Sequence, residues 1–259
     1  MEFDLDVRVV RGPASRPVRD MIVQHHYLHS APSAESAFAV TLQGKEDGLV
    51  VWEELVGGAL YGGGSNRFLG SPYGLNHNGV TELVRLFLLD DVKDHVSNAA
   101  SRVLSMTMKY LRNHTDKHLA IAFSDPVAGH DGGVYKASNW KCIGESDPKK
   151  VISMDGVFIE DRTAYEILGD TKQHTLRHIS AQTGMEIEKV LVPGKLRYAY
   201  VTSSDRREKK RLDLLINQLC QTYEEKSSRR NANETSSETE PSTTRGGTAI
   251  DAPLSQTAG

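Results

Sequence analysis

Two short segments of the chain concentrate side chains that can take part in acid–base chemistry. The first is His25-His26-Tyr27-Leu28-His29-Ser30, which places three imidazoles and one phenol within six residues. Imidazole titrates near neutral pH, so these side chains can accept protons or ligate a metal ion. The alternative interpretation is an exposed helix end, where histidine is favoured by the helix dipole.

The second segment spans residues 123–140 and reads FSDPVAGHDGGVYKASNW. Asp125 follows a short apolar run that predicts a buried strand, and open α/β sheets place functional groups just beyond their strand ends. Proline and several glycines predict a tight turn that fixes Asp125 and His130. Tyr135, at the start of an expected helix, can face the same cleft as a general acid. Alternatively, Asp125 caps backbone amides and Trp140 fills the core.

Hydrophobic periodicity predicts the elements that position these segments. Strands are expected at 2–10, 36–43, 49–61, 80–89, 119–123, 140–143 and 196–202, with a hairpin at 151–161. Helices are expected at 15–27, 97–112, 133–138, 163–184 and 205–223. The alternation of the two predicts one α/β domain over residues 1–225. Residues 226–259 hold almost no large apolar side chain, which predicts a disordered polar tail.

Composition limits the class of protein. A chain of 259 residues with 38% hydrophobic residues suits one principal core. The sequence has no apolar stretch long enough to span a bilayer, and only two cysteines, so we expect a cytoplasmic protein without disulfides or a zinc finger. The net charge of −3 leaves one local basic patch, from Lys189 to Arg211, as a candidate for nucleic-acid binding. A solvated helix face explains that patch equally well.

The order of elements resembles the GNAT acetyltransferase superfamily, whose mixed sheet splays between its fourth and fifth strands. A more specific resemblance, over roughly residues 20–145, is to the Mom family of phage-encoded, GNAT-like enzymes that modify adenine in DNA. The motifs that carry it are His26-Tyr27, Glu82–Leu86, Asn98–Ser101, Ser124-Asp125 and Gly129–Trp140. The resemblance implies conversion of adenine to N6-carbamoylmethyladenine, or a related N6 adduct, in double-stranded DNA, which protects phage DNA from restriction in the host cytoplasm.

The resemblance also implies roles for individual residues. Those expected to be catalytic are His26, Tyr27, Asp125, Tyr135 and one serine of the long helix, Ser101 or Ser105. Those expected to contact the substrate are Ser124, His130, Asn139 and Arg85, and Tyr27, Tyr61 or Tyr73 can stack on a flipped base.

The donor and cofactor are less determined. His26, Tyr27 and Asp125 offer imidazole, phenolate and carboxylate, a set suited to iron. The glycine-rich loop with which GNAT enzymes hold coenzyme A is replaced by acidic residues at 90–97, which argues against an acyl-CoA donor. Two alternatives stay open: a CoA-dependent N-acyltransferase acting on a small amine or protein, and a noncatalytic DNA-binding anti-restriction protein. The sequence matches no helix-turn-helix, zinc-finger or RRM pattern.

Overall fold

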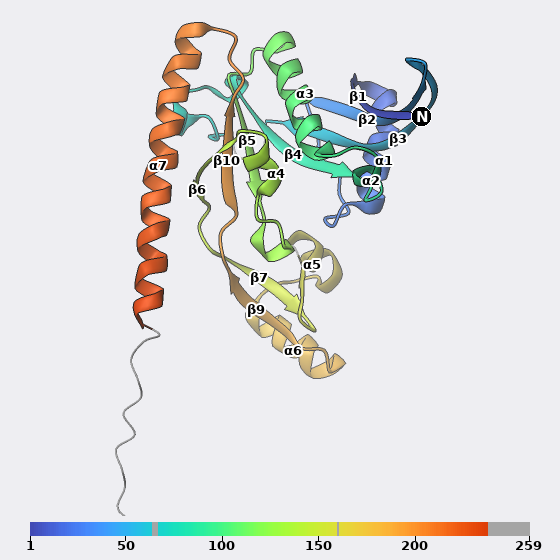
Figure 1. Cartoon of the computed structure of the whole chain (residues 1–259). Helices are drawn as coiled ribbons and strands as arrows, with labels where there is room; N and C mark the ends of the chain where they lie inside the picture. The colour runs from blue at the N-terminus through green and yellow to red at the C-terminus, as the bar shows by residue number, and fades with distance from the viewer. Residues whose placement is uncertain (64–66, 160, 238–259) are drawn as a thin grey trace, which may run out of the picture. The chain divides into compact units, whose positions relative to one another are not determined.

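The computed structural model describes residues 1–63, 67–159 and 161–237 (Figure 1). Residues Met1–Tyr223 form one compact unit, and Glu224–Gly259 are assigned to a second. The first unit is a mixed α/β fold with a seven-stranded sheet in the order β1-β2-β3-β4-β5-β10-β6 and a three-stranded sheet in the order β8-β7-β9. The expected α/β class is therefore confirmed.

The strands are β1 (Glu2–Val10), β2 (Ser36–Glu46), β3 (Leu49–Gly62), β4 (Val80–Leu88), β5 (Leu119–Ser124), β6 (Lys141–Glu145), β7 (Lys149–Met154), β8 (Val157–Ile159), β9 (Ile187–Val192) and β10 (Leu196–Val201). The helices are α1 (Arg16–His25), α2 (Val92–His95), α3 (Ala99–His114), α4 (Gly133–Ala137), α5 (Asp161–Leu168), α6 (Gln173–Thr183) and α7 (Arg206–Ser237). The sequence pattern did not predict α2 or β9.

The large sheet splays at its centre. Strands β1 to β4 pair in succession as an antiparallel meander. Strand β4 then pairs with β5 in parallel, but only from Val80 opposite Leu119 to Leu83 opposite Ala122. Beyond Leu83, β4 continues to Leu88 against β3 alone. The two strands thus separate into a wedge, as the resemblance to GNAT enzymes implied.

Helix α3 packs on one face of the sheet (Figure 1). Its apolar face, with Leu104 and Met108, packs in one core cluster with Ala120 and Ala122 of β5. Trp140 belongs to the same cluster and is 3% exposed, so the expectation that it fills the core is confirmed. Strand β5 is apolar on both faces because it is covered on both, which is typical of a central strand.

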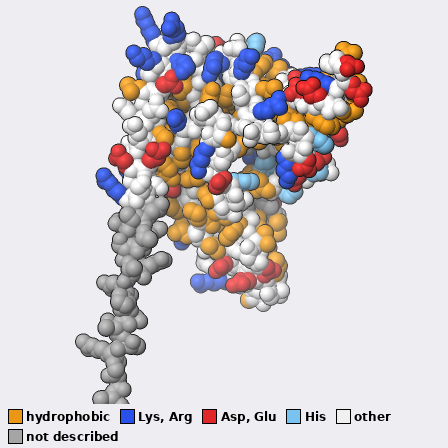
Figure 2. Space-filling model, in the orientation of Figure 1, with side chains coloured by type: hydrophobic (Ala, Val, Ile, Leu, Met, Phe, Trp, Pro, Cys, Tyr) orange, Lys and Arg blue, Asp and Glu red, His pale blue; other side chains and the backbone are white. Residues whose placement is uncertain are grey.

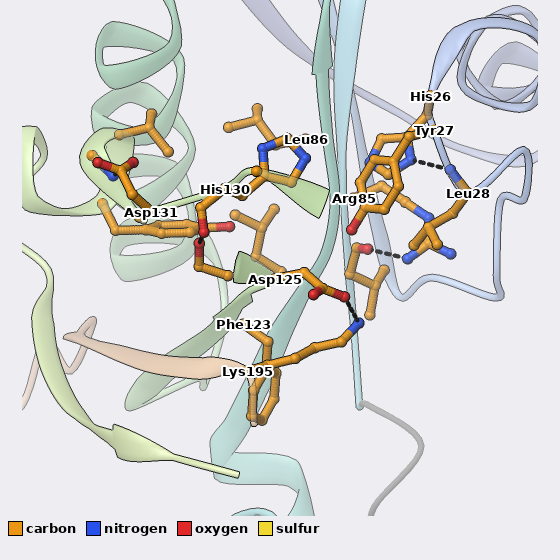
Figure 3. Close-up of a pocket in the computed structure, with 18 of the residues that line it drawn as sticks. His26, Tyr27, Leu28, Arg85, Leu86, Phe123, Asp125, His130, Asp131 and Lys195 are labelled. Carbon is orange, nitrogen blue, oxygen red and sulfur yellow. Dashed lines mark hydrogen bonds and ion pairs between the residues drawn. The ribbon is translucent and has the colours of Figure 1, made fainter. Parts of the chain in front are cut away.

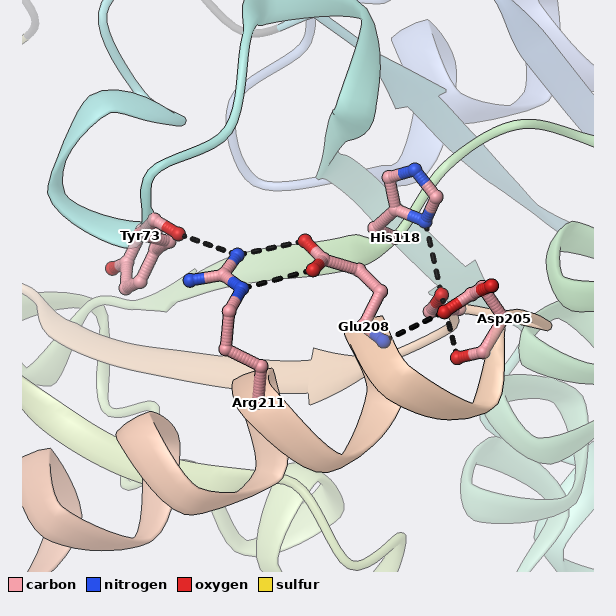
Figure 4. Close-up of polar contacts among 6 residues, drawn as sticks. Tyr73, His118, Asp205, Glu208 and Arg211 are labelled. Atoms are coloured by element: carbon pink, nitrogen blue, oxygen red, sulfur yellow. Dashed lines mark hydrogen bonds and ion pairs between the residues drawn. The ribbon is translucent and has the colours of Figure 1, made fainter.

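Helix α7 is anchored where it begins (Figure 4). The carboxylate of Asp205 accepts the backbone N–H of Glu208 at 2.7 Å, as an N-cap does. Arg211 donates to both carboxylate oxygens of Glu208 and, through Nη2, to the carbonyl of Tyr73 at 2.9 Å. His118 Nδ1 lies 3.0 Å from the hydroxyl of Ser203, just before the helix. These bonds join the start of α7 to the loop before β4 and to β5.

The expected polar tail begins inside α7. The helix continues to Ser237, so residues 226–237 are helical in the structure, and residues 238–259 lie outside the described part of the chain. Within the described residues, no helix has both the length and the apolar character needed to cross a membrane.

Candidate active site

A cavity of about 340 Å³ opens in the wedge between β4 and β5 (Figure 3). Four chain segments line it: the end of α1 and the residues after it, β4, the connection from β5 into α4, and the residue that precedes β10. The cavity therefore lies just beyond the end of β5, where the strands separate. Its volume falls within the usual range for small-ligand sites.

His26 caps the end of α1 and faces this cavity as a neutral imidazole. Its Nδ1 accepts the backbone N–H of Leu28 at 3.1 Å, which leaves the ring proton on Nε2. Burial, reinforced by the positive charge of Arg85, lowers the pKa of His26 to about 4. At neutral pH, His26 is therefore a hydrogen-bond donor through Nε2 rather than a base.

Tyr27 forms an aromatic platform at the mouth of the cavity. Its ring stacks on His26 with centroids 4.5 Å apart and lies against His130 with centroids 5.0 Å apart. Tyr27 is nevertheless 45% exposed, which leaves part of its ring open to a ligand. The segment at residues 25–30 and the segment at residues 123–140, which are far apart in the sequence, thus meet through the contact between the rings of Tyr27 and His130.

Arg85 positions this platform from β4. Its Nε donates to the Ser30 carbonyl at 2.9 Å and its Nη2 to the Ser30 hydroxyl at 2.7 Å, while Nη1 donates to the Val84 carbonyl at 2.6 Å. These bonds hold the segment after α1 against the strand. Arg85 therefore positions this segment, and because it also lines the cavity, its contact with substrate stays a prediction.

Asp125 lies across the cavity from His26 and Tyr27 (Figure 3). Its Oδ1 accepts the backbone N–H of Val127 at 3.1 Å, so the expected capping of backbone amides is present. Its Oδ2 forms an ion pair with Lys195 Nζ at 2.8 Å, and the two side chains are only 18% and 28% exposed. Sequence patterns did not point to Lys195, because it follows Asp125 only after a long intervening segment of chain.

The connection from β5 to α4 is rigid for identifiable reasons. The buried hydroxyl of Ser124 donates to the carbonyl of His130 at 2.7 Å, so Ser124 closes the loop. Gly132 has a left-handed φ of +76°, and a Cβ there would lie 2.2 Å from the hydroxyl oxygen of Tyr198. Only glycine fits this position. Ser124 is thus a loop-closing residue, while His130 remains beside Tyr27.

Tyr135 reaches the cavity from α4. Its ring stacks on Tyr198 with centroids 4.9 Å apart and lies 5.5 Å from the Trp140 ring centroid. Burial, with a smaller effect from Tyr27, raises the pKa of Tyr135 well above its usual value. The phenol therefore stays protonated near neutral pH and can donate a hydrogen bond into the cavity.

Glu82 is a second carboxyl group in the cavity, on β4. Burial raises its pKa above the usual value, and the opposing effects of Arg85 and Lys195 do not cancel that rise. A carboxylate with a raised pKa is a better base than an exposed one. The sequence motif contained Glu82, but nothing in its spacing indicated that it faces the site.

The chain matches the Mom protein family over residues 7–220. The chain belongs to this family. The match covers most of the sequence, including the C-terminal third on which the motifs gave little information. No curated protein matches the chain.

Solved acetyltransferases have a related fold. The ribosomal-protein-S5-alanine acetyltransferase from Vibrio fischeri is 10% identical and aligns over 77% of this chain and 94% of its own, with a TM-score of 0.39. The N-acetyltransferase NAA60 from Arabidopsis thaliana, in complex with acetyl-CoA, is 9% identical over 76% of this chain and 99% of its own, with a TM-score of 0.41. At this level of similarity, neither says anything about the chemistry of this Mom family member.

Several residues predicted for the Mom-like site lie elsewhere. Tyr61 is fully buried and bonds Thr107 on α3 at 2.8 Å, and Tyr73 is 2% exposed, so neither ring can stack on a base. Ser105 is exposed away from the cavity lining, and Ser101 donates to the Asn98 carbonyl at 2.9 Å. The inward-facing hydroxyl of α3 is that of Thr107. The helical spacing places Thr107, and not Ser105, on the apolar face with Leu104 and Met108.

Asn139, which was expected to contact the substrate, lies outside the cavity lining. It follows α4 with a left-handed φ of 61°, a conformation that asparagine tolerates at helix C-termini. Its backbone N–H donates to the Lys136 carbonyl at 3.2 Å, and it does not line the cavity.

The metal set predicted from His26, Tyr27 and Asp125 does not fit this arrangement. His26 Nδ1 already accepts the Leu28 N–H, and a cation at Asp125 would lie beside the ammonium group of Lys195. No cluster of three or more His, Cys, Asp or Glu side chains suited to a metal ion occurs among residues 1–63, 67–159 and 161–237.

The segment between β4 and α3 lacks the cradle for a pyrophosphate. It contains the short helix α2 and no glycine, and Asp90, Asp91 and Asp94 are exposed there. Carboxylates at this position repel phosphate groups, whereas a glycine-rich helix N-terminus attracts them. This Mom family member therefore departs from the usual GNAT site for coenzyme A.

Proposed function

We propose that this protein is a transferase that modifies the N6 amino group of adenine in double-stranded DNA, yielding N6-carbamoylmethyladenine or a related adduct that protects the DNA from restriction. The observation that carries the proposal is the convergence of Tyr27, His26, Asp125 and Tyr135, the residues expected from the Mom family, on one cavity. The family and the fold indicate a transferase, and the particular modification follows from the family resemblance.

The target adenine must leave the duplex to enter a cavity of this kind, which costs a few kcal/mol of unstacking. Tyr27 is the only one of the three tyrosines considered for stacking whose ring is exposed at the cavity. We assign it the stacking contact with the flipped base. His26 Nε2–H, on the neighbouring ring, then donates to a base nitrogen that carries a lone pair.

We assign proton removal from N6 to Asp125 and Glu82, two of the carboxyl groups that line the cavity. The N6 lone pair is delocalised into the ring, so the amino group becomes nucleophilic only as a proton leaves. Asp125, fixed by Lys195 and by the Val127 amide, accepts a hydrogen bond from N6 and orients it. Glu82, with its raised pKa, takes the proton as the new carbon–nitrogen bond forms.

The donor is a small molecule with an activated carbamoylmethyl group. As N6 bonds to its carbon, the electron pair of the broken bond departs with the leaving group. The Tyr135 hydroxyl, kept protonated by burial, stabilises that developing charge by a hydrogen bond. The acidic segment between β4 and α3 disfavours binding of coenzyme A at its usual GNAT position. We therefore place the donor in the cavity that receives the adenine.

Restriction protection tests this proposal. Plasmid from cells expressing the protein is cut with endonucleases whose sites contain adenine and with others whose sites contain only guanine and cytosine. We expect protection only at adenine-containing sites, lost in Asp125→Ala and kept in Asp213→Ala, an exposed aspartate of α7. Cleavage of both classes of site, with folded protein present, would refute it.

A further inference from the structure

An insert with a core of its own separates two neighbouring strands of the large sheet. Between β6 and β10 the chain forms β7, β8, α5, α6 and β9. Five buried residues of this insert, Ile152, Met154, Ala164, Leu176 and Ile187, form one cluster. The insert is therefore a small folded element within the compact unit, and the proposed chemistry assigns it no role.

Helices α5 and α6 form a helix-turn-helix unit, which the sequence pattern had merged into one helical region. Residues 169–172 join the helices, and Gly169 has a left-handed φ of 73°. The carboxylate of Asp170 fixes the turn, accepting the Lys172 N–H at 3.1 Å and the Thr175 hydroxyl at 2.8 Å. A short turn containing glycine between two helices that share a core is the pattern of this motif.

The exposed face of α6 has the chemistry of a base-reading helix. Gln173, His174, Arg177, His178 and Gln182 are all exposed. The spacing of the last four turns them away from the buried Leu176, and Gln173 lies in the first turn at the edge of this face. The helix contains no aspartate or glutamate. Arginine and glutamine are the side chains that pair with guanine and adenine edges in the major groove.

The basic patch expected from Lys189 to Arg211 is a weaker candidate. Figure 2 shows Lys and Arg side chains gathered over the start of α7. Several charges of the patch from Lys189 to Arg211 are already paired, however: Lys209 with Asp213, Arg211 with Glu208, and Lys195 with Asp125. No such pairing within the helix occupies the polar face of α6, because α6 has no acidic residue.

We propose that α6 enters the major groove of duplex DNA beside the target adenine and reads the flanking base pairs. This inference rests on the proposed function, because base reading would select the adenine to be modified. Its test measures duplex binding and does not require any modification. The insert lies at the end of the sheet where β5 ends (Figure 1), and the residues that link β9 to β10 include Lys195, the partner of Asp125. We therefore expect a duplex held by α6 to lie near the cavity.

Duplex binding by the full chain tests the proposal directly. Fluorescence anisotropy with a labelled duplex of about 20 base pairs, roughly two helical turns, compares the wild type with Arg177→Glu. The matched control is Arg16→Glu on α1, where the side chain of Arg16 is 83% exposed. We expect Arg177→Glu to weaken binding about tenfold or more, the range for losing one base-reading arginine and adding a repelled charge. Arg16→Glu should stay within about twofold of the wild type.

A second variant tests base reading in a way that depends on neither a change in folding nor catalysis. The double change Gln173→Ala and His174→Ala removes two exposed side chains, and circular dichroism verifies that helix content is unchanged. We expect it to reduce discrimination between duplexes of different sequence while binding to all of them persists. This readout needs no adduct, so it holds even where no modified adenine forms.

The outcomes separate the possibilities. Weakened binding by Arg177→Glu alone supports the inference, including in a protein that modifies no DNA. Equal affinity of the wild type and both Arg variants overturns it, as does a wild type that binds no duplex. A change of oligomeric state in Arg177→Glu with unaltered DNA affinity also overturns it, because the face would then bind a second copy.

Discussion

The ion pair between Asp125 and Lys195 gives the sharpest quantitative prediction about the site. The two charged atoms lie 2.8 Å apart, and the side chains are 18% and 28% exposed. At an effective dielectric constant of about 20, such a pair attracts by about 6 kcal/mol before solvation is counted. Desolvation and side-chain ordering oppose most of this, so we expect a net coupling of about 1 to 3 kcal/mol, between the values for exposed and buried pairs.

A double-mutant cycle measures that coupling. Urea unfolding of the wild type, Asp125→Asn, Lys195→Met and the double variant gives the interaction free energy. Asparagine is chosen because its side-chain oxygen can still accept the Val127 N–H. The control cycle uses Lys209 and Asp213, an exposed i,i+4 pair of α7 with side chains 47% and 42% exposed, which should couple by less than about 0.5 kcal/mol. Equal coupling in both cycles would refute the stronger coupling expected of the half-buried Asp125–Lys195 pair.

The remaining predictions concern other residues of the site. Gly132→Ala should lower the free energy of unfolding by about 2 kcal/mol or more, because Gly132 has a left-handed φ and a Cβ there would clash with Tyr198. Gly169→Ala, where φ is also left-handed but no atom lies within 4 Å of the new Cβ, should lower it by about 1 kcal/mol. Urea unfolding measures both. NMR titration should give His26 a pKa near 4. Because the folded state binds this proton less tightly than the unfolded state, stability should fall as the pH drops from about 6.5 towards 4; a His26 titrating at 6.5 would contradict the burial argument. Glu82→Gln should lower the modification rate by about 10²-fold or more with the fold intact, and wild-type activity would contradict its role as base. Tyr135→Phe should reduce the modification rate. The wild-type rate should not fall through ionisation of Tyr135 up to pH 10, because the pKa of its phenol is raised. A fall in rate at alkaline pH that disappears in Tyr135→Phe would contradict the raised pKa.

The sequence predicted the elements whose patterns are local and strong. Alternation along 2–10 and the apolar run of 119–123 each correspond to a strand, β1 and β5. Strand β9 was missed because its exposure follows no strict alternation, and it forms a strand by pairing with β7, a contact distant in sequence. The division into α5 and α6 was missed because only residues 169–172, which begin with the left-handed Gly169, interrupt the helical segment.

The site was predictable where its residues form a motif and unpredictable where they meet only in the fold. His26, Tyr27, Asp125 and Tyr135 belong to segments rich in polar side chains, and all four line the cavity. Tyr61 was misassigned because period-two alternation does not reveal that the end of β3 is covered on both faces.

Lys195 and Glu82 were missed for a related reason. Lys195 reaches the site only because β10 lies next to β5 in the sheet. Glu82 faces the cavity only because β4 and β5 part after Leu83. Neither relation can be read from spacing along the chain.

Nucleoside mass spectrometry tests the central claim most directly. Plasmid DNA from cells expressing the wild type, Asp125→Ala or Asp213→Ala is digested to nucleosides, and any new deoxyadenosine species is fragmented to locate the added group. We predict a species in the wild type and in Asp213→Ala whose extra mass equals a carbamoylmethyl group or a related adduct on N6, and its loss in Asp125→Ala. Unmodified adenine from cells that contain folded wild-type protein, or an adduct that persists in Asp125→Ala, would contradict the proposed role of this site.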